Sequence, residues 1–177
     1  MFFLKPHARA WKNLGTFVCV FMGTGVCSTT ALAHIHVSPQ KMIQGGRAKL
    51  IFSVKHGCKG SPTQKLQVQI PKGIASFHGV EKAGWKIQST NSKEAEGAER
   101  KVAWSGGSIP NESTAEFVVE VTVNKTAAGI LVFPVLQGCE KGELKWVDVP
   151  AKEGAVGGEK ETEAPAPTVK IITAQKR

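Results

Sequence analysis

The sequence has no long apolar run after Ala33. A membrane-spanning helix needs about 20 consecutive apolar residues, so we expect no membrane span in the mature chain. A block of lysines and arginines is missing as well. Basic residues occur singly, and the formal net charge of +9 therefore indicates a solvated surface and disfavours nucleic acid as a partner.

A sustained 3.6-residue apolar pattern is also missing, which disfavours a helical domain. Apolar and polar residues instead alternate with a period of two between Gly, Pro, Asn and Ser clusters, which predicts short strands. The expected strands are residues 50–54, 66–70, 85–87, 102–104, 117–123, 129–137, 144–147 and 168–172. About eight short strands favour an all-β sandwich, immunoglobulin- or cupredoxin-like, with a closed barrel as the alternative.

Two of these strand predictions depend on turn residues. The segment "SGGSIPN" is expected to end the strand that contains Trp104, and Pro134 is expected at a bulge or edge within residues 129–137. Residues 151–164 are rich in Gly, Ala, Glu and Pro, which predicts a mobile loop. A terminal strand is expected within residues 165–173.

The first 33 residues have the pattern of a secretory signal peptide. A basic start precedes the apolar stretch from Leu14 to Cys27, and Ala31-Leu32-Ala33 provides a small-x-small cleavage site. We expect residues 1–33 to be cleaved and residues 34–177 to form one domain in the periplasm or another extracytoplasmic space. A membrane-anchored form of the same segment is the alternative.

Cysteine is scarce, and Cys58 and Cys139 are the two that remain after processing. In an oxidising compartment they are most simply one disulfide. Closing a loop of that length contributes about 4 kcal/mol in the chain-entropy model. Two free thiols that bind a metal are the alternative, although neither cysteine lies in a C-x-x-C pair.

Cleavage after Ala33 makes His34 the first residue, which creates a metal chelator. The α-amino group has an ordinary pKa near 8, so a divalent metal displaces its proton at neutral pH. The amine and the imidazole Nδ1 of His34 then hold one ion in a six-membered ring. Such a nitrogen-rich arrangement favours Cu(II).

His36 offers a second copper geometry, because it is the third residue of the mature chain. A free amine, two deprotonated amides and this imidazole would surround the ion with four nitrogens. That geometry needs a flexible terminus, so pinning the terminus in a strand favours chelation by His34. Both imidazoles would then share one face. The simpler interpretation is that His34 and His36, like the loop residues His56 and His78, are polar surface.

A copper site also needs a neighbour that is anionic or soft. Glu116 and Glu120 are expected on the strand face opposite Phe117, where each projects outward, and a solvated edge explains them equally well. Trp146 and Trp104 are expected in the core. A tryptophan packed over a copper ion would shield it and influence its redox behaviour.

With these residues assembled, the chain resembles the YcnI-like family of exported copper-binding proteins from His34 to about Ile171. The matching blocks, in order, are "AHIHVSP", "KHGCKGSPTQKLQVQIPKGI", "GWK", "WSGG", "AEFVVEV", then Gln137, Cys139, Gly142 and Trp146, and finally "PAP". Seven ordered blocks make the resemblance specific.

The resemblance implies a β-sandwich with one Cu(II) per chain, held by the amine and imidazole of the processed histidine, a carboxylate and a nearby tryptophan. By position these are His34, Glu116 with Glu120 in reserve, and Trp146. It also implies a Cys58–Cys139 disulfide. Many relatives lack a histidine at the third mature position, so His36 leaves the coordination mode open.

The family context is copper homeostasis, alongside other exported copper carriers and membrane copper transporters. We therefore expect a copper metallochaperone and no enzymatic activity, with release of the ion on reduction to Cu(I). Two other functions remain open. A copper monooxygenase would need His56 or His78 to complete its site, and a metal-free interaction module would need no processed terminus.

Overall fold

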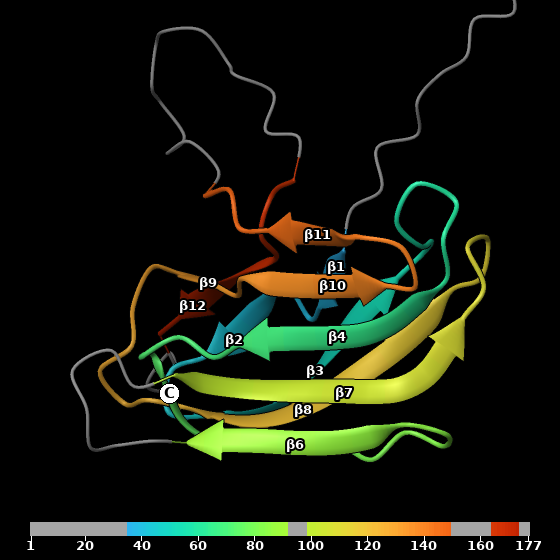
Figure 1. Ribbon diagram of the computed structural model, residues 1–177. Coiled ribbons are helices and arrows are strands. Elements are labelled where there is room, and N and C mark those ends of the chain that lie inside the picture. Colours follow the sequence, from blue (N-terminus) through green and yellow to red (C-terminus); the bar gives the residue numbers. More distant parts are fainter. Residues whose placement is uncertain (1–34, 92–98, 150–163, 174–177) are drawn as a thin grey trace, which may run out of the picture. The chain divides into compact units, whose positions relative to one another are not determined.

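The computed structural model describes residues 35–91, 99–149 and 164–173, which contain twelve strands and no helix (Figure 1). The first six strands are β1 (His36–Ser38), β2 (Lys41–Ile43), β3 (Arg47–Val54), β4 (Thr63–Gln69), β5 (Ile74–Gly79) and β6 (Lys86–Asn91). The other six are β7 (Arg100–Ile109), β8 (Ala115–Val123), β9 (Ile130–Val132), β10 (Val135–Cys139), β11 (Glu143–Trp146) and β12 (Thr168–Ile172).

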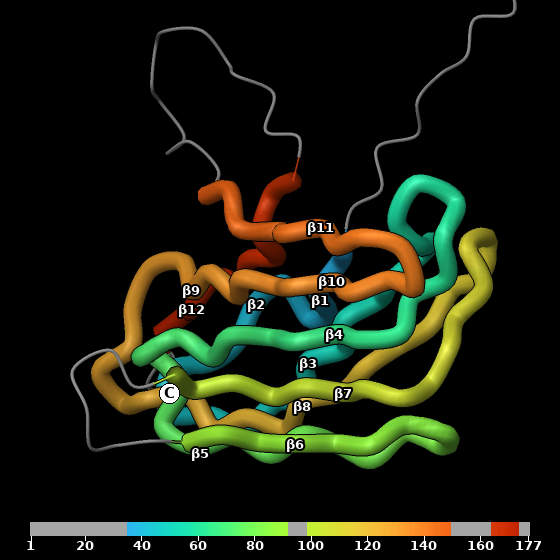
Figure 2. Tube along the Cα trace, in the orientation of Figure 1, coloured from blue at the N-terminus to red at the C-terminus, as the bar shows by residue number. Residues whose placement is uncertain are grey.

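Two sheets face each other as a sandwich. One sheet has the strand order β1-β3-β8-β5 and the other has the order β11-β10-β4-β7-β6. Strands β5 and β6 contact each other along one side, so the edge strands β1 and β11 lie on the opposite side (Figures 1 and 2). A third, smaller sheet has the order β2-β12-β9.

The core follows from the alternation along each strand. Phe117 and Val119 of β8 point inward and are buried, and they face Trp104 of β7, whose ring centroid lies 5.3 Å from that of Phe117. The indole Nε1 of Trp104 donates to the carbonyl of Val80 at 2.9 Å, so its burial leaves no unsatisfied donor. The predicted β-sandwich is confirmed.

One predicted strand is two strands in different sheets. Residues 129–137 divide into β9, which pairs with β12, and β10, which pairs with β4 and β11. Pro134 lies at the break, because a proline has no N–H to continue a ladder. Its carbonyl still accepts a hydrogen bond from the Gln69 backbone N–H at 2.9 Å. The prediction of a continuous strand was therefore wrong.

The predicted end of β7 was also wrong. The strand continues through the glycines to Ile109, and Gly106 has a φ of 83°. That backbone conformation is open to glycine at no steric cost. The register against β4 shifts between Thr63 and Lys65, so the glycine bends the strand without ending it.

Strands β1, β2 and β5 were not predicted. The first two have three residues each, which is too short for a period-two pattern to register. Strand β5 is preceded by a turn that Arg100 holds, since its guanidinium donates to the carbonyls of Pro71 at 3.1 Å and Ile74 at 2.7 Å. Burial lowers the pKa of Arg100 from its usual value.

The expected signal peptide and residues 151–163 of the expected loop lie outside the described residues. Strand β12 lies within the expected terminal strand, and an isolated bridge between Asp148 and Pro165 precedes it. Within the described ranges, the structure contains no helix long and apolar enough to cross a membrane.

Candidate functional site

Strand β1 fixes the chain directly after His34. Ile35 and Val37 are buried in the core, whereas His36 between them is exposed. The backbone of His36 is in register with Ser53 of β3. His34 itself lies outside the described residues, but one peptide bond joins it to the buried Ile35.

The register places His36 and Glu116 in one row across the outer face of the sheet. Ser53 of β3 is opposite His36 on one side and opposite Glu116 of β8 on the other. The Cα atoms of His36 and Glu116 are therefore two strand spacings apart, about 10 Å. Both side chains are exposed. The structure thus brings these two predicted ligands to the same face of the sheet, with one strand between them.

Glu120 lies apart from that row. It is four residues along β8 from Glu116, which is about 13 Å of extended chain. Its carboxylate forms an ion pair with Lys49 Nζ at 3.0 Å, and it is opposite His78 in the register with β5. The two predicted carboxylates are therefore not neighbours, and Glu120 already has a cationic partner.

Trp146 is buried at the end of β11, with an exposed fraction of 3%. Its indole Nε1 donates to Gln137 Oε1 at 3.1 Å. The amide nitrogen of Gln137 donates in turn to the His56 carbonyl and to Thr63 Oγ1, each at 2.8 Å. All polar atoms of the Gln137 side chain are thus satisfied, and they connect Trp146 to the loop that follows β3.

Sequence reasoning used Gln137 only as part of a motif and did not assign it this role. The available signal was its phase: Gln137 shares the inward face of β10 with Val135. A glutamine on a buried face requires hydrogen-bond partners. Its partners are distant in the sequence, so the pattern could not name them.

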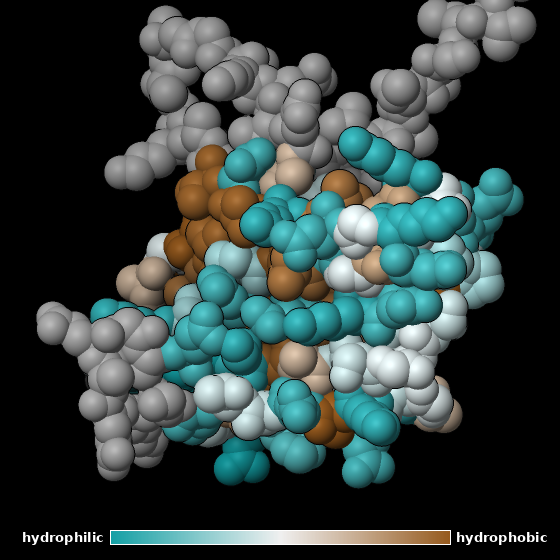
Figure 3. Space-filling model, in the orientation of Figure 1, coloured by the Kyte–Doolittle hydropathy of each residue, from teal (hydrophilic) through white to brown (hydrophobic). Residues whose placement is uncertain are grey.

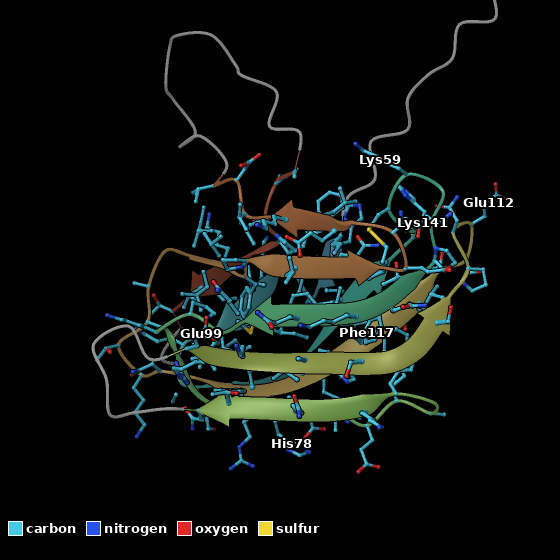
Figure 4. The ribbon with its side chains drawn as sticks, viewed as in Figure 1. Lys59, His78, Glu99, Glu112, Phe117 and Lys141 are labelled. Atoms are coloured by element: carbon cyan, nitrogen blue, oxygen red, sulfur yellow. A yellow bond between two sulfur atoms is a disulfide. The ribbon has the colours of Figure 1, made fainter. Side chains whose placement is uncertain are left out.

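The disulfide between Cys58 and Cys139 is present, with Cα atoms 5.9 Å apart. It joins the loop after β3 to the end of β10, two residues beyond Gln137. Figure 4 shows Lys59 and Lys141 beside this disulfide. The expected disulfide is confirmed, and it closes the same region that the Gln137 hydrogen bonds connect.

The two remaining histidines lie in different places. His56 is half-buried in the loop after β3, the strand that pairs with β1. His78 is exposed on β5, at the opposite edge of the sheet from β1 (Figure 4). Three strand spacings, about 14 Å, separate β5 from β1. His78 is therefore not a neighbour of the mature terminus.

Within residues 35–91, 99–149 and 164–173, no three His, Cys, Asp or Glu side chains are grouped closely enough to hold a metal ion. His36 and Glu116 supply two donors on the outer face near β1. A metal centre at β1 would thus need further ligand atoms, such as those of His34, which lies outside the described residues.

Comparison with a solved structure supports the fold, and two further structures are more distantly similar. A solved structure of an uncharacterized protein from Nocardia farcinica with an immunoglobulin-like fold is 23% identical, with a TM-score of 0.63, and the alignment covers 78% of this chain and 97% of that chain. A cohesin module from a Clostridium perfringens family 33 glycoside hydrolase is 12% identical, with a TM-score of 0.46 and coverage of 81% and 98%. The seventh ScaB type I cohesin from Pseudobacteroides cellulosolvens is 9% identical, with a TM-score of 0.41 and coverage of 81% and 94%.

No curated protein matches the sequence. A family model described as "Domain of unknown function (DUF1775)" matches residues 34–171. That match begins at the residue expected to be first after processing, and it spans every strand of the sandwich up to β12. The chain therefore belongs to the DUF1775 family, with an immunoglobulin-like β-sandwich fold.

Proposed function

We propose that this protein is an exported copper carrier whose cargo is one Cu(II) ion, held by the amine and imidazole of a processed His34. The observation that carries the proposal is the position of Ile35. Because Ile35 is buried and His36 pairs with β3, the residue before them is attached to a rigid strand. A chelating amino terminus at this end of β1 would therefore be attached next to a fixed part of the protein surface.

The donor set fits copper. Amine and imidazole nitrogens bind Cu(II) more tightly than other divalent first-row metal ions, and a carboxylate supplies compensating negative charge. Glu116 is the carboxylate on the β1 row, whereas Glu120 pairs with Lys49. We therefore propose Glu116 as the acidic ligand, with His36 on the same face two strands away.

The β1 pairing also favours one of the two copper geometries. The four-nitrogen geometry requires the amides of residues 35 and 36 to lose their protons and wrap around the ion. The burial of Ile35 and the register of His36 with Ser53 oppose that rearrangement. Chelation by the amine and imidazole of His34 leaves the strand intact.

Trp146 is proposed to shield the ion and to tune its release. Its indole orientation is fixed by Gln137, and its strand β11 is the edge strand on the same side of the sandwich as β1. The alternative of a copper monooxygenase needs a second histidine, and His78 lies at the far edge of the sheet. His56 is the histidine that such an enzyme would have to use.

The test compares Cu(II) binding by processed protein with binding by a form that carries one extra glycine before His34. The extension displaces the amine from the chelate ring, so we expect a loss of affinity of about 100-fold or more, measured by titration against a competing chelator. Intact mass verifies the first residue of each form. Equal affinity in the two forms would contradict the proposal.

A further inference from the structure

The outer face of the small sheet β2-β12-β9 combines exposed isoleucines with lysines. We call it the Ile/Lys face, and its residues are Lys41 and Ile43 of β2, Lys170 and Ile172 of β12, and Ile130 of β9. The register places Ile43 beside Ile172, and Lys170 between Lys41 and Ile130. All three isoleucines are exposed: Ile43 by 53%, Ile172 by 39% and Ile130 by 65%.

These isoleucines are not part of the core. The alternate residues of the same strands, which are Met42, Leu131, Val169 and Ile171, are all buried against the sandwich. Figure 3 shows hydrophobic side chains gathered over β9 and β12. A single exposed isoleucine needs no explanation, but three on one small sheet form a patch that the fold itself does not require.

Four described segments at this sheet have positive charge and no negative charge. Residues 40–47, 71–74, 124–132 and 167–173 contain no aspartate or glutamate, and they carry Arg47, Lys72 and Lys125 in addition to the face itself. Backbone hydrogen bonds join these segments, including Gln44 N–H to the Ile172 carbonyl and Asn124 N–H to the Gly73 carbonyl, each at 2.9 Å.

The lysines of the face are also not neutralised locally. The ion pairs found among the described residues involve Lys49, Lys101 and Lys145, and neither Lys41 nor Lys170 takes part in them. Both of these side chains are exposed. Their charges are therefore available to an external anion.

We propose that the Ile/Lys face is a docking surface for an anionic lipid bilayer. Lysine ammonium groups are attracted to the phosphates of anionic lipids, and the isoleucines enter the interface between the headgroups and the acyl chains. The face is one side of a sheet, and its ammonium groups take part in none of the ion pairs found among the described residues. It therefore offers charge and apolar area, which suit a bilayer better than the directional contacts of an acidic protein. The proposal does not depend on the copper site.

The test is sedimentation of the processed protein with vesicles of phosphatidylethanolamine containing phosphatidylglycerol, beside neutral phosphatidylcholine vesicles. We expect binding to the anionic vesicles that weakens as NaCl is raised, because surface charges are screened. Lys41→Gln combined with Lys170→Gln is expected to lower the partition coefficient about tenfold or more. Ile43→Thr with Ile130→Thr and Ile172→Thr retains β-branched residues and is expected to lower it as well.

A matched control lies on another face. Lys65→Gln with Lys86→Gln removes the same charge from the outer face of the larger sheet. This control should bind vesicles as the unmodified protein does. The proposal is overturned if the unmodified protein does not bind anionic vesicles, or if control and face variants lose binding equally. Binding of a soluble acidic polypeptide without vesicle binding would overturn it in favour of a protein partner.

Discussion

The indole Nε1 of Trp146 donates to Gln137 Oε1 at 3.1 Å, and both side chains are buried. The same glutamine holds the His56 carbonyl and Thr63 Oγ1, so one side chain connects β11, β10, β4 and the loop after β3. This arrangement is well suited to fixing the orientation of Trp146. It also makes Gln137 a residue on which the stability of the whole region depends.

Replacement of Gln137 by leucine is expected to destabilise the fold. The substitution leaves the Trp146 Nε1, the Thr63 hydroxyl and the His56 carbonyl without this partner in a buried place, at a cost of about 2–4 kcal/mol in the free energy of unfolding. Urea denaturation measures the loss. Gln69→Leu, on the exposed face of β4, is the matched control and should change stability by less than about 0.5 kcal/mol. An unchanged midpoint for Gln137→Leu would contradict the assigned role.

Much of the fold follows from local patterns in the sequence. The alternation in "AEFVVEVTV" predicts both the strand and the buried face of β8, and two cysteines in a chain with a predicted signal peptide predict their bond. The division of residues 129–137 could not be predicted, because both halves are apolar and their sheets are chosen by distant partners. The extension of β7 through Gly106 depends on a bulge against β4, which is a tertiary effect.

The candidate site shows the same limit. Alternation predicts that Glu116 and Glu120 are exposed, but it cannot show that Glu116 shares a row with His36 or that Glu120 pairs with Lys49. Those relationships depend on the order β1-β3-β8 and its register. The hydrogen bonds of Gln137 likewise join residues 74 and 81 positions apart in the chain.

Removal of the disulfide is expected to reduce stability without changing the fold. Cys58→Ser with Cys139→Ser frees a loop with a sequence separation of 81 residues. The chain-entropy model predicts a loss of about 4 kcal/mol in the free energy of unfolding. Urea denaturation with and without a thiol reductant is the measurement. The reductant should destabilise the unmodified protein and leave the double variant unaffected, whereas equal sensitivity of both would show that the bond contributes no stability.

The two predicted carboxylates should differ in their effect on copper. Glu116→Gln is expected to lower Cu(II) affinity at least tenfold, an effect comparable with the loss of a partner around a metal site. Glu120 lies about 13 Å from Glu116 along β8 and is paired with Lys49. Glu120→Gln should therefore leave the Cu(II) affinity nearly unchanged. Competition titrations of both variants decide the assignment. A larger loss for Glu120→Gln would reverse it.

His36→Ala tests the coordination geometry. If His34 chelates the ion through its amine and imidazole, the variant should still bind one Cu(II) with little change in the electron paramagnetic resonance spectrum. If the four-nitrogen geometry holds, the third-position imidazole is lost and the spectrum changes. The pairing of His36 with Ser53 favours the first outcome. His78→Ala, on the far edge of the same sheet, is the control histidine variant.

If the protein carries Cu(II) as proposed, reduction is expected to release the ion. Cu(I) prefers softer ligands and fewer of them than an amine, an imidazole and a carboxylate provide. Dialysis of the copper-loaded protein with ascorbate should therefore lower the bound copper, compared with dialysis under the same conditions without reductant. Intact mass checks that the disulfide persists, so that unfolding does not explain the loss. Trp146→Phe retains an aromatic ring but removes the Nε1 donor to Gln137, and it should change the rate of release if a fixed indole controls that step. Retention of Cu(I) with the affinity of Cu(II) would contradict the proposal that reduction releases copper.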